Sequence, residues 1–270
     1  MLKAKKRYGQ NFLKDETIKL KIIQSMPNDN KDIVEIGPGL GDLTQKLLDS
    51  KKSVSAFEID LELCGFLKDK FKDELSSGEL TLVCSDVLKR WEGSSLLSQK
   101  YHLIANLPYY IATKIILKAL EDNKCDTILV MVQKEVALKF AAKSKDKQFG
   151  SLAILANSIA DVEVMFDVSR DSFEPKPKVT SSVLRLKKVK EFVDEGSKDA
   201  LFESFEEFEK FKQMLRVSFS SPRKTLQKNL QAIMQKDDIL DLFDKLNLSF
   251  SVRPHELSIE TYHLLFRKIK

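Results

Sequence analysis

The residues best suited to chemistry form the stretch Asn106-Leu107-Pro108-Tyr109, which directly follows an apolar run from Tyr101 to Ala105. Such a run is typical of a buried strand, so the stretch would lie at a strand end. There it presents a side-chain amide, carbonyl acceptors next to a proline that donates no N–H, and an aromatic face for a nucleobase. These groups could hold the exocyclic amine of a flat base during methyl transfer. The simpler interpretation is a strand-ending turn with a packed tyrosine.

A glycine-rich loop lies upstream, in the segment from Val34 to Thr44. Ile33 to Ile36 predicts a strand, and the leucines after the glycines predict a helix. A strand, glycines and a helix in this order let a nucleotide approach the backbone at the edge of a doubly wound sheet. The spacing is G-x-G-x-G, which differs from the G-x-G-x-x-G of dinucleotide sites. With Glu35 before the loop, the pattern is more typical of an S-adenosylmethionine site.

Two acidic residues follow the next two predicted strands. Glu58 lies 21 positions after Gly37, where a carboxylate can accept both hydroxyls of a ribose. Asp86 stands just past the strand that begins at Leu80, where it could accept a hydrogen bond from an adenine amino group. Either residue alone could equally be a helix cap or part of a solvated turn. Together with the loop and Asn106, they put a group suited to a nucleoside at each of four strand ends.

Motifs along nearly the whole chain resemble those of the ribosomal RNA adenine N6,N6-dimethyltransferase family, and are most similar to its bacterial small-subunit (16S) branch. In chain order, the motifs are Gly9-Gln10-Asn11-Phe12-Leu13, Glu35-Ile36-Gly37-Pro38-Gly39, Glu58-Ile59-Asp60, Ser85-Asp86, Asn106-Leu107-Pro108-Tyr109, Phe173 to Ser181, Arg223-Lys224-Thr225-Leu226 and Arg253-Pro254-His255-Glu256-Leu257-Ser258. The ordered set is far more specific than any one of its members.

The resemblance implies a role for each matching residue. The residues implied to bind the cofactor S-adenosyl-L-methionine are Asn11, Leu13, Gly37, Glu58, Asp86 and Asn106. At the catalytic centre, Asn106 and the Pro108 carbonyl would accept hydrogen bonds from the target amine, while the adenine would stack between Tyr109 and Phe173. Phe173 could instead be a core residue before a proline-rich loop.

Basic residues occur in blocks that suggest contact with a phosphate backbone. Residues 176–190 and 210–228 each hold six basic and no acidic residues, whereas residues 191–209 hold eight acidic residues and one lysine. The residues predicted to bind RNA are Lys5, Lys6, Arg7, Arg223 and Lys224. Family members often carry two adjacent arginines before the equivalent of Lys224, but here the first position is Pro222. This departure from the family pattern concerns the expected RNA contact of that helix and leaves the enzyme core unaffected. Each block could also be an ordinary solvated face.

The cysteines and histidines predict no metal site. Cys64, Cys84 and Cys125 are widely spaced, and an odd count without a disulfide framework fits a reduced cytoplasm. None of the three histidines has a Cys or His neighbour at ligand spacing. Because the chain shows neither a signal peptide nor a run of about 20 apolar residues, we expect a cytoplasmic protein.

Hydrophobic periodicity predicts an α/β fold with a mainly parallel seven-stranded sheet, and the family resemblance implies that this is a Rossmann-like class I methyltransferase. Strands are expected at residues 32–36, 53–58, 79–84, 101–105, 127–133, 161–168 and 182–188, the last two forming an antiparallel edge. From about residue 190 only helices are expected, including one over residues 222–234 with Pro222 in its first turn. We therefore expect a cofactor-binding methyltransferase domain over residues 1–190 and a helical domain over 191–270, in contact with RNA or the ribosome.

Three functions fit these features. The first is dimethylation of two adjacent adenosines near the 3′ end of 16S rRNA in the small (30S) subunit or its precursor, by a monomeric enzyme. The second is dimethylation of one adenosine of large-subunit (23S) rRNA, which confers antibiotic resistance. Relatives of that branch more often carry Ile where this chain has Leu107. The third is a ribosome-assembly protein without catalysis, which the intact loop, Glu58, Asp86 and Asn106 argue against.

Overall fold

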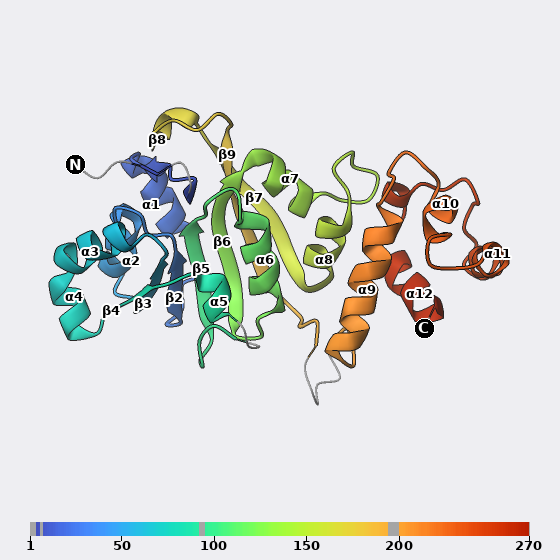
Figure 1. Ribbon diagram of the computed structural model, residues 1–270, viewed down its shortest axis with the longest axis horizontal. Helices are drawn as coiled ribbons and strands as arrows, with labels where there is room; N and C mark the ends of the chain where they lie inside the picture. Colours follow the sequence, from blue (N-terminus) through green and yellow to red (C-terminus); the bar gives the residue numbers. More distant parts are fainter. Residues whose placement is uncertain (1–3, 6–7, 92–94, 194–199, 270) are drawn as a thin grey trace. The chain divides into compact units, whose positions relative to one another are not determined.

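The computed structural model describes residues 4–5, 8–91, 95–193 and 200–269. Strands and helices alternate through most of the chain, and helices alone follow the last strand (Figure 1). The strands are β1 (Phe12–Leu13), β2 (Asp32–Ile36), β3 (Val54–Glu58), β4 (Leu80–Cys84), β5 (Tyr101–Asn106), β6 (Cys125–Gln133), β7 (Ala160–Val168), β8 (Phe173–Glu174) and β9 (Ser181–Lys188). The helices are α1 (Glu16–Gln24), α2 (Asp42–Asp49), α3 (Leu61–Lys70), α4 (Lys72–Ser77), α5 (Val87–Arg90), α6 (Ala112–Glu121), α7 (Lys134–Ala141), α8 (Ser151–Ile159), α9 (Phe205–Ser218), α10 (Leu226–Leu230), α11 (Lys236–Lys245) and α12 (Ile259–Ile269).

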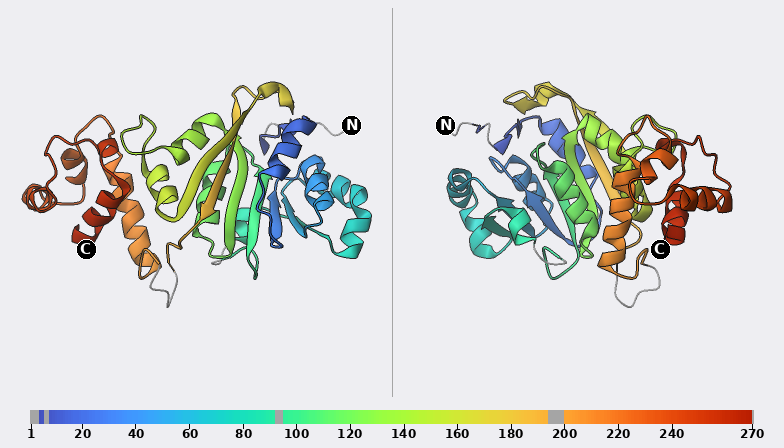
Figure 2. Two further views of the ribbon diagram at one scale, coloured as in Figure 1. Left: turned by 180° about the vertical axis from the view of Figure 1, so that it is seen from behind. Right: turned by 45° about the vertical axis from the view of Figure 1, so that its right-hand side comes forward.

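A seven-stranded sheet in the order β4-β3-β2-β5-β6-β9-β7 organises the fold. The neighbouring strands from β4 to β6 are parallel, and β9 runs antiparallel to β6. The view from behind in Figure 2 shows β9 passing between β6 and the edge strand β7. The predicted mainly parallel sheet of a Rossmann-like fold is therefore confirmed.

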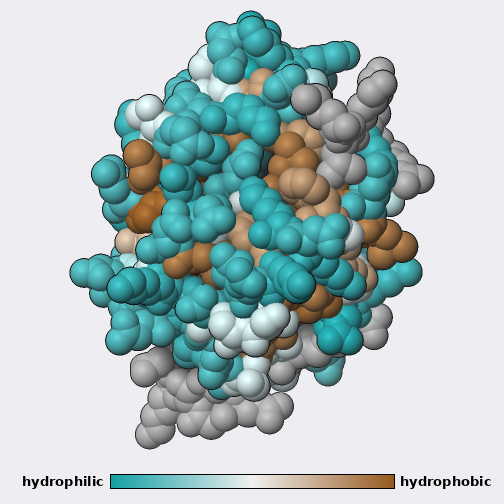
Figure 3. Space-filling view, turned by 90° about the vertical axis from the view of Figure 1, so that its left-hand side faces the viewer, coloured by the Kyte–Doolittle hydropathy of each residue, from teal (hydrophilic) through white to brown (hydrophobic). Residues whose placement is uncertain are grey.

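The central strands are buried because helices cover them, as is usual for parallel sheets. In β6, every residue from Thr127 to Val132 is buried, and all of them except Thr127 are apolar. Helix α6, drawn in front of β5 and β6 in Figure 1, turns its buried positions Ile115, Ile116 and Ala119 inward at helical spacing. The face in Figure 3 is mainly hydrophilic, with separate hydrophobic areas. No helix among the described residues is long and apolar enough to cross a membrane.

A second, two-stranded sheet fixes the segment before α1. Strand β1 pairs antiparallel with β8, with Phe12 opposite Glu174 and Leu13 opposite Phe173. Both strands have two residues. Periodicity needs a longer window, so the sequence predicted neither strand. The pairing ties the N-terminal segment to a part of the chain about 160 residues away, a separation that follows from the register.

Two compact units divide the chain: residues 1–137 with 161–188, and residues 138–160 with 189–270. The second unit therefore includes α8 in addition to the C-terminal helices. The expected boundary at residue 190 had placed α8 in the first domain. Within the second unit, Phe192, Phe202, Phe208 and Phe211 form a chain of aromatic contacts. These rings supply much of its core.

One predicted helix is wrong in extent. Helix α10 covers five residues, Leu226–Leu230, instead of residues 222–234. The Thr225 hydroxyl accepts a hydrogen bond from the Lys228 amide at 3.4 Å, so the helix begins there and not at Pro222. Pro222 lies in the preceding turn, which the bond from the Lys224 amide to the Ser221 carbonyl closes at 2.9 Å.

Candidate active site

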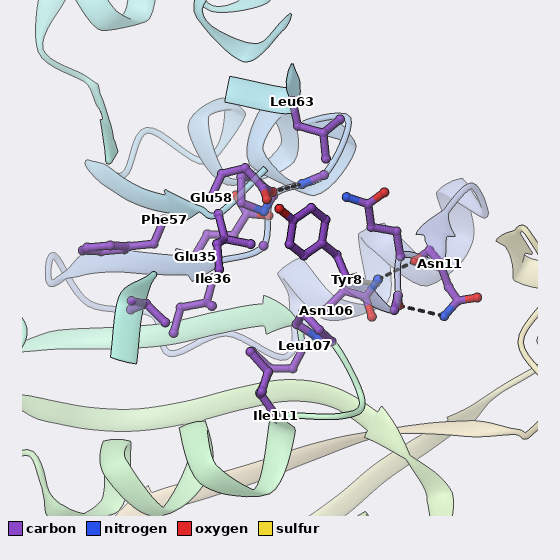
Figure 4. A pocket seen from close by; sticks show the side chains of 18 of the residues that line it. Tyr8, Asn11, Glu35, Ile36, Phe57, Glu58, Leu63, Asn106, Leu107 and Ile111 are labelled. Carbon is purple, nitrogen blue, oxygen red and sulfur yellow. Dashed lines mark hydrogen bonds between the residues drawn. The ribbon is translucent and has the colours of Figure 1, made fainter. Parts of the chain in front are cut away.

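Most of the predicted site residues line one pocket at the carboxyl ends of the parallel strands (Figure 4). The pocket lies where β2 and β5 are neighbours in the sheet, although β3 and β4 separate them in sequence. A change in strand order of this kind leaves a crevice beyond the strand ends, where open α/β sheets bind ligands. The predicted residues that the pocket brings together are Asn11, Leu13, Gly37, Glu58, Asp86, Asn106, Pro108 and Tyr109.

The loop after β2 needs its glycines. Gly39 and Gly41 have φ angles of 62° and 75°. A Cβ atom on Gly41 would collide with the ring of Phe71, and one on Gly39 would lie 3.0 Å from a ring carbon of Phe12. Because glycine alone adopts these angles without a Cβ penalty, the loop can turn sharply beneath the pocket.

Glu35 lies at the end of β2, under this loop, and is 1% exposed. Its Oε2 accepts a hydrogen bond from the Thr44 hydroxyl at 2.6 Å. Burial raises the pKa of the Glu35 carboxyl to about 8, and the nearby charge of Glu58 acts in the same direction. At neutral pH the Glu35 carboxyl is therefore mainly protonated.

Glu58 at the end of β3 is held by backbone donors. Its Oε2 accepts from the Gly39 amide at 3.3 Å, and its Oε1 accepts from the Asp60 amide at 2.9 Å. Burial raises the pKa of this carboxyl, while the two backbone bonds lower it. A carboxylate has about four acceptor positions, so each oxygen keeps one for a ligand hydroxyl. Figure 4 shows the bond that joins Glu58 to the loop.

Asp86 both lines the pocket and caps a helix. It is the N-cap residue of α5, and its Oδ1 accepts from the Leu88 amide at 3.0 Å. The cap interpretation and the ligand interpretation are thus compatible, because the second carboxylate oxygen is left for another donor. Next to it, the buried hydroxyl of Ser85 has no hydrogen-bond partner within the described part of the chain, and Ser85 also lines the pocket.

Asn106 ends β5 with its side chain fixed. Its Nδ2 donates to the Asn11 carbonyl at 3.1 Å, a contact drawn in Figure 4. One N–H of the amide is therefore engaged, and the amide oxygen is the group left to accept a bond. The Pro108 carbonyl already accepts from the Ile111 amide at 3.1 Å and keeps its second lone pair. Both predicted acceptors thus lie at the same end of β5.

Tyr109 is anchored by a distant strand. Its hydroxyl shares a hydrogen bond of 2.6 Å with the Ser181 hydroxyl on β9, and burial raises the pKa of the phenol. The next residue, Tyr110, also lines the pocket and is 58% exposed. A Cβ atom on Gly9 would lie 3.3 Å from its ring. Tyr110 was not predicted from the sequence; its position directly after Tyr109 was the available signal.

Phe173 is the one predicted catalytic residue that the structure does not bring into the pocket. It is 3% exposed and packs in a hydrophobic cluster with Leu13, Val168 and Val183. In this structure its environment is that of a core residue. Through the β1 to β8 pairing it lies directly opposite Leu13, which does line the pocket.

The predicted RNA-binding residues fall in separate places. The Lys5 ammonium contacts Asp60 and Glu62, each at 2.7 Å, so its charge is balanced within the protein. Lys6 and Arg7 lie outside the described residues. Arg223 and Lys224 are exposed in the turn before α10, in the second unit.

Two side-chain clusters lie outside the predicted roles. Cys64 and Cys84 are joined in a disulfide, which their spacing in the sequence did not indicate. At the amino ends of the strands, Asp29, His102 and Asp126 place potential metal-ligand atoms within 4.8 Å of one another. The Lys31 ammonium contacts both aspartates, at 2.9 and 3.1 Å, and so supplies the positive charge there.

The chemistry of the pocket fits S-adenosylmethionine. It contains the carboxyl groups of Glu35, Asp42, Glu58 and Asp86, and no Lys, Arg or His is among the described residues that line it. An acceptor-rich wall suits a cationic sulfonium and a ribose diol, whereas the Asp42 carboxyl at the N-terminus of α2 would repel a pyrophosphate there. The unsatisfied Ser85 hydroxyl and the free lone pairs of Glu58 are suited to an adenosine. Fold and pocket together define a Rossmann-like, S-adenosylmethionine-dependent methyltransferase.

Comparison with known proteins gives the family. A profile of the ribosomal RNA adenine dimethylase family matches residues 1–270. The chain is 51% identical to ribosomal RNA small subunit methyltransferase A of Campylobacter curvus (strain 525.92), over 100% of this chain and 93% of that protein. It is 44% identical to the protein of the same name from Campylobacter jejuni (strain RM1221), over 100% of this chain and 96% of that one. The chain belongs to the ribosomal RNA adenine dimethylase family.

Solved structures agree on the fold. The crystal structure of a dimethyladenosine transferase from Plasmodium falciparum has a TM-score of 0.74 at 25% identity, and the match covers 94% of this chain and 95% of that one. The crystal structure of the 23S rRNA methyltransferase ErmE has a TM-score of 0.69 at 22% identity, over 96% of this chain and 99% of that one. The likeness to ErmE supports the architecture alone.

Proposed function

We propose that the protein transfers methyl groups from S-adenosylmethionine to N6 of two adjacent adenosines near the 3′ end of 16S rRNA, in the small ribosomal subunit or its precursor, giving N6,N6-dimethyladenosine. The observation that carries the proposal is the fixed Asn106 amide at the end of β5, with Tyr109 three residues on and an acceptor-rich pocket beside it. The small-subunit name of relatives up to 51% identical supports this target over the large subunit.

Asn106 and Pro108 would act on the target amine. Its lone pair is delocalised into the adenine ring, which makes the amine a poor nucleophile. The Asn106 amide oxygen and the Pro108 carbonyl accept hydrogen bonds from the two amine hydrogens and favour a pyramidal nitrogen. S-adenosylmethionine supplies an activated methyl group on its sulfonium. The nitrogen then loses a proton to solvent, so no strong base is needed, and alignment of the reactants contributes roughly 7–11 kcal/mol.

Tyr109 would hold the target adenine after this base has left the stack of bases in the RNA. Stacking on an aromatic ring is worth roughly 1–3 kcal/mol per base, similar to the cost of unstacking it. The hydrogen bond from Tyr109 to Ser181 keeps the ring in one orientation. Phe173 can serve as the second face only if it leaves the core in which it is buried here.

The two parts of the chain would divide the work, with residues 1–190 binding the cofactor and residues 191–270 contacting RNA. We expect a monomeric, cytoplasmic enzyme in which Arg223 and Lys224, together with the segment of Lys5, Lys6 and Arg7, approach phosphates. The double variant Arg223→Gln, Lys224→Gln should lower the slope of log affinity against log salt by about 1 for each lost phosphate contact. Lys68→Gln with Lys72→Gln, also exposed, is the control. An unchanged slope would remove this pair from the RNA interface.

The direct test is transfer of labelled methyl groups to purified small and large subunits that lack native methylation, followed by nucleoside analysis. N6,N6-dimethyladenosine in the small subunit alone is the expected result. Label in the large subunit would move the target to that particle. Binding of the cofactor without label in either particle would instead support a non-catalytic assembly protein.

A further inference from the structure

The disulfide between Cys64 and Cys84 joins two residues whose neighbours in sequence line the pocket. The two residues are 20 positions apart in sequence, and their Cα atoms are 6.0 Å apart. Cys64 is in the first turns of α3, and Cys84 is the last residue of β4. The proposed methyl transfer uses neither of them. The third cysteine, Cys125, is free and fully buried in β6.

Each cysteine is adjacent in sequence to a residue that lines the pocket. Leu63 precedes Cys64, and Figure 4 shows its side chain reaching the pocket from α3. Ser85 and Asp86 directly follow Cys84 and also line the pocket. The disulfide therefore joins the helix that carries Leu63 to the loop that carries Ser85 and Asp86.

Glu58 connects the same two segments. In the parallel ladder it lies opposite Cys84, and its carbonyl oxygen is 3.6 Å from the Cys64 sulfur. A thiol at Cys64 can donate a weak hydrogen bond to this carbonyl, whereas a disulfide sulfur carries no hydrogen to donate. A change in the state of this sulfur thus directly alters a contact of the residue suited to hold the ribose.

We propose that Cys64 and Cys84 form a reversible thiol–disulfide modification site that sets the affinity of the pocket for its adenosine-containing ligand. The disulfide holds α3 and the loop of Ser85 and Asp86 at a fixed separation, so the pocket is preorganised; the dithiol lets them move apart. This inference rests on the proposed cofactor binding. Reversible cysteine pairs of this kind are the usual disulfides of a reducing compartment, where permanent ones are rare.

The oxidant is a low-molecular-weight disulfide, and the exchange is balanced. Cys84 is partly exposed and Cys64 is 3% exposed, so the Cys84 thiolate attacks the small disulfide first and releases one small thiol. The Cys64 thiolate then displaces the second small thiol and forms the internal bond. Two protein thiols and one small disulfide thus give one protein disulfide and two small thiols, and excess small thiol reverses both steps.

The coupling between disulfide formation and ligand binding can be measured through either process. If the disulfide tightens ligand binding by some factor, the ligand must shift the dithiol–disulfide equilibrium toward the disulfide by the same factor. Couplings between sites typically reach about fivefold or more, so we expect at least about a fivefold lower Kd for the oxidised protein. The ratio of disulfide to dithiol in a glutathione buffer should rise by the same factor when ligand is present.

The experiment uses the full chain, reduced with dithiothreitol or oxidised with glutathione disulfide, and then freed of reagent. Alkylation in denaturant with mass spectrometry should find three thiols in the reduced form and, in the oxidised form, one thiol at Cys125. Calorimetry with S-adenosylhomocysteine should then give the tighter Kd for the oxidised form. Cys84→Ser should bind equally after either treatment, with Cys64→Ser as a second variant. Cys125→Ala should respond as the wild type does.

Other results would overturn the proposal. Three alkylatable thiols after oxidation would show that the pair does not close. A Kd that is the same in both states, or tighter in the reduced one, would show that the bond does not organise the pocket. Binding by neither form would refute the proposed cofactor site itself, a failure distinct from either of the others because the thiol count is measured separately.

Discussion

The two halves of the pocket are built differently. In the adenosine half, the carboxylates of Glu58 and Asp86 are held by backbone amides two residues further along the chain, at Asp60 and Leu88. In the target half, Asn106 is held by the Asn11 carbonyl, 95 residues away, and Tyr109 by Ser181, 72 residues away. Apart from the bond that Glu58 also accepts from the Gly39 amide, the adenosine half is organised by local turns and the target half by contacts between distant segments.

This difference has a consequence for function. Local bonds at strand ends form whenever the sheet forms, so the carboxyl groups of Glu58 and Asp86 should each be oriented before any ligand binds, whatever the separation of α3 and the loop of Ser85 and Asp86. The target half depends on how the N-terminal segment and β9 meet the end of β5, and small displacements there change the alignment of the reacting groups. Alignment errors of about 1 Å can lower rates by about 10²-fold. Substitutions in the two halves should therefore affect different kinetic parameters.

The largest effect should come from Asn106→Ala. The change removes an acceptor from the target amine and the anchor to Asn11, so kcat should fall by about 10²- to 10³-fold. The affinity for S-adenosylhomocysteine and for RNA should change much less, since Glu58, Asp86 and the basic residues are intact. Single-turnover methylation with separate binding measurements checks this.

Asn30→Ala, an exposed asparagine at the amino side of β2, is the matched control for Asn106→Ala. It should leave kcat and the affinities for S-adenosylhomocysteine and for RNA at wild-type values. If Asn106→Ala kept wild-type turnover and RNA affinity, the proposed mechanism would have to be abandoned.

Tyr109→Ala should come next. Loss of the stacking ring costs about 1–3 kcal/mol, so the KM for the RNA particle should rise by about ten- to a hundredfold. Binding of S-adenosylhomocysteine should stay within a few fold. Tyr109→Phe separates ring from hydroxyl, because it keeps the stacking face and loses only the bond to Ser181. Equal losses for both variants would show that the hydroxyl, and not the ring, matters.

Glu58→Gln tests the adenosine half. The side-chain NH2 of glutamine would face the Gly39 or Asp60 amide, donor against donor. We expect the Kd for S-adenosylhomocysteine to rise by about tenfold, with kcat at saturating cofactor close to wild type. Glu79→Gln, an exposed position before β4, is the control. A fall in kcat without a change in Kd would erase the distinction between the halves.

The sequence predicted the part of the site that local contacts organise better than the part that contacts between distant segments organise. Glu58 and Asp86 were predictable because each follows an apolar run and needs only its own strand end to be placed. Asn106 could be placed in the same way. Asn11 came from the family resemblance as a cofactor-binding residue, and its bond to Asn106 was not predicted. The Tyr109 to Ser181 bond was not predicted, since no local pattern connects β9 with the end of β5.

The sequence and the structure differ in three further places. Phe173 looks like a site residue in the motif, yet its pairing with Leu13 buries it, and two-residue strands leave no periodic signal. Cys64 and Cys84 meet because β3 and β4 are neighbours, which sequence spacing cannot show. Pro222 fitted a helix start, but the Thr225 cap three residues later is where α10 begins. The first two features depend on tertiary contacts, whereas the Thr225 cap is a local bond.

The last prediction concerns stability instead of kinetics, at Glu35 on β2, the strand between β3 and β5. Its pKa of about 8 in the folded protein lies above the usual value of 4.5, so between these two pH values the folded state binds a proton that the unfolded state has lost. The free energy of unfolding should therefore fall as pH rises through this window, by at most about 1.4 kcal/mol per pH unit. Glu35→Gln carries no titrating proton and should flatten this slope.

Urea unfolding at several pH values between 5 and 8 measures the slope for wild type, Glu35→Gln and the exposed control Glu79→Gln. The control should keep the wild-type slope. Parallel curves for wild type and Glu35→Gln would mean that Glu35 is charged in the folded protein at neutral pH. The floor of the pocket would then carry a full negative charge beneath the glycine loop, and both halves would be electrostatically prepared for a cation before it binds.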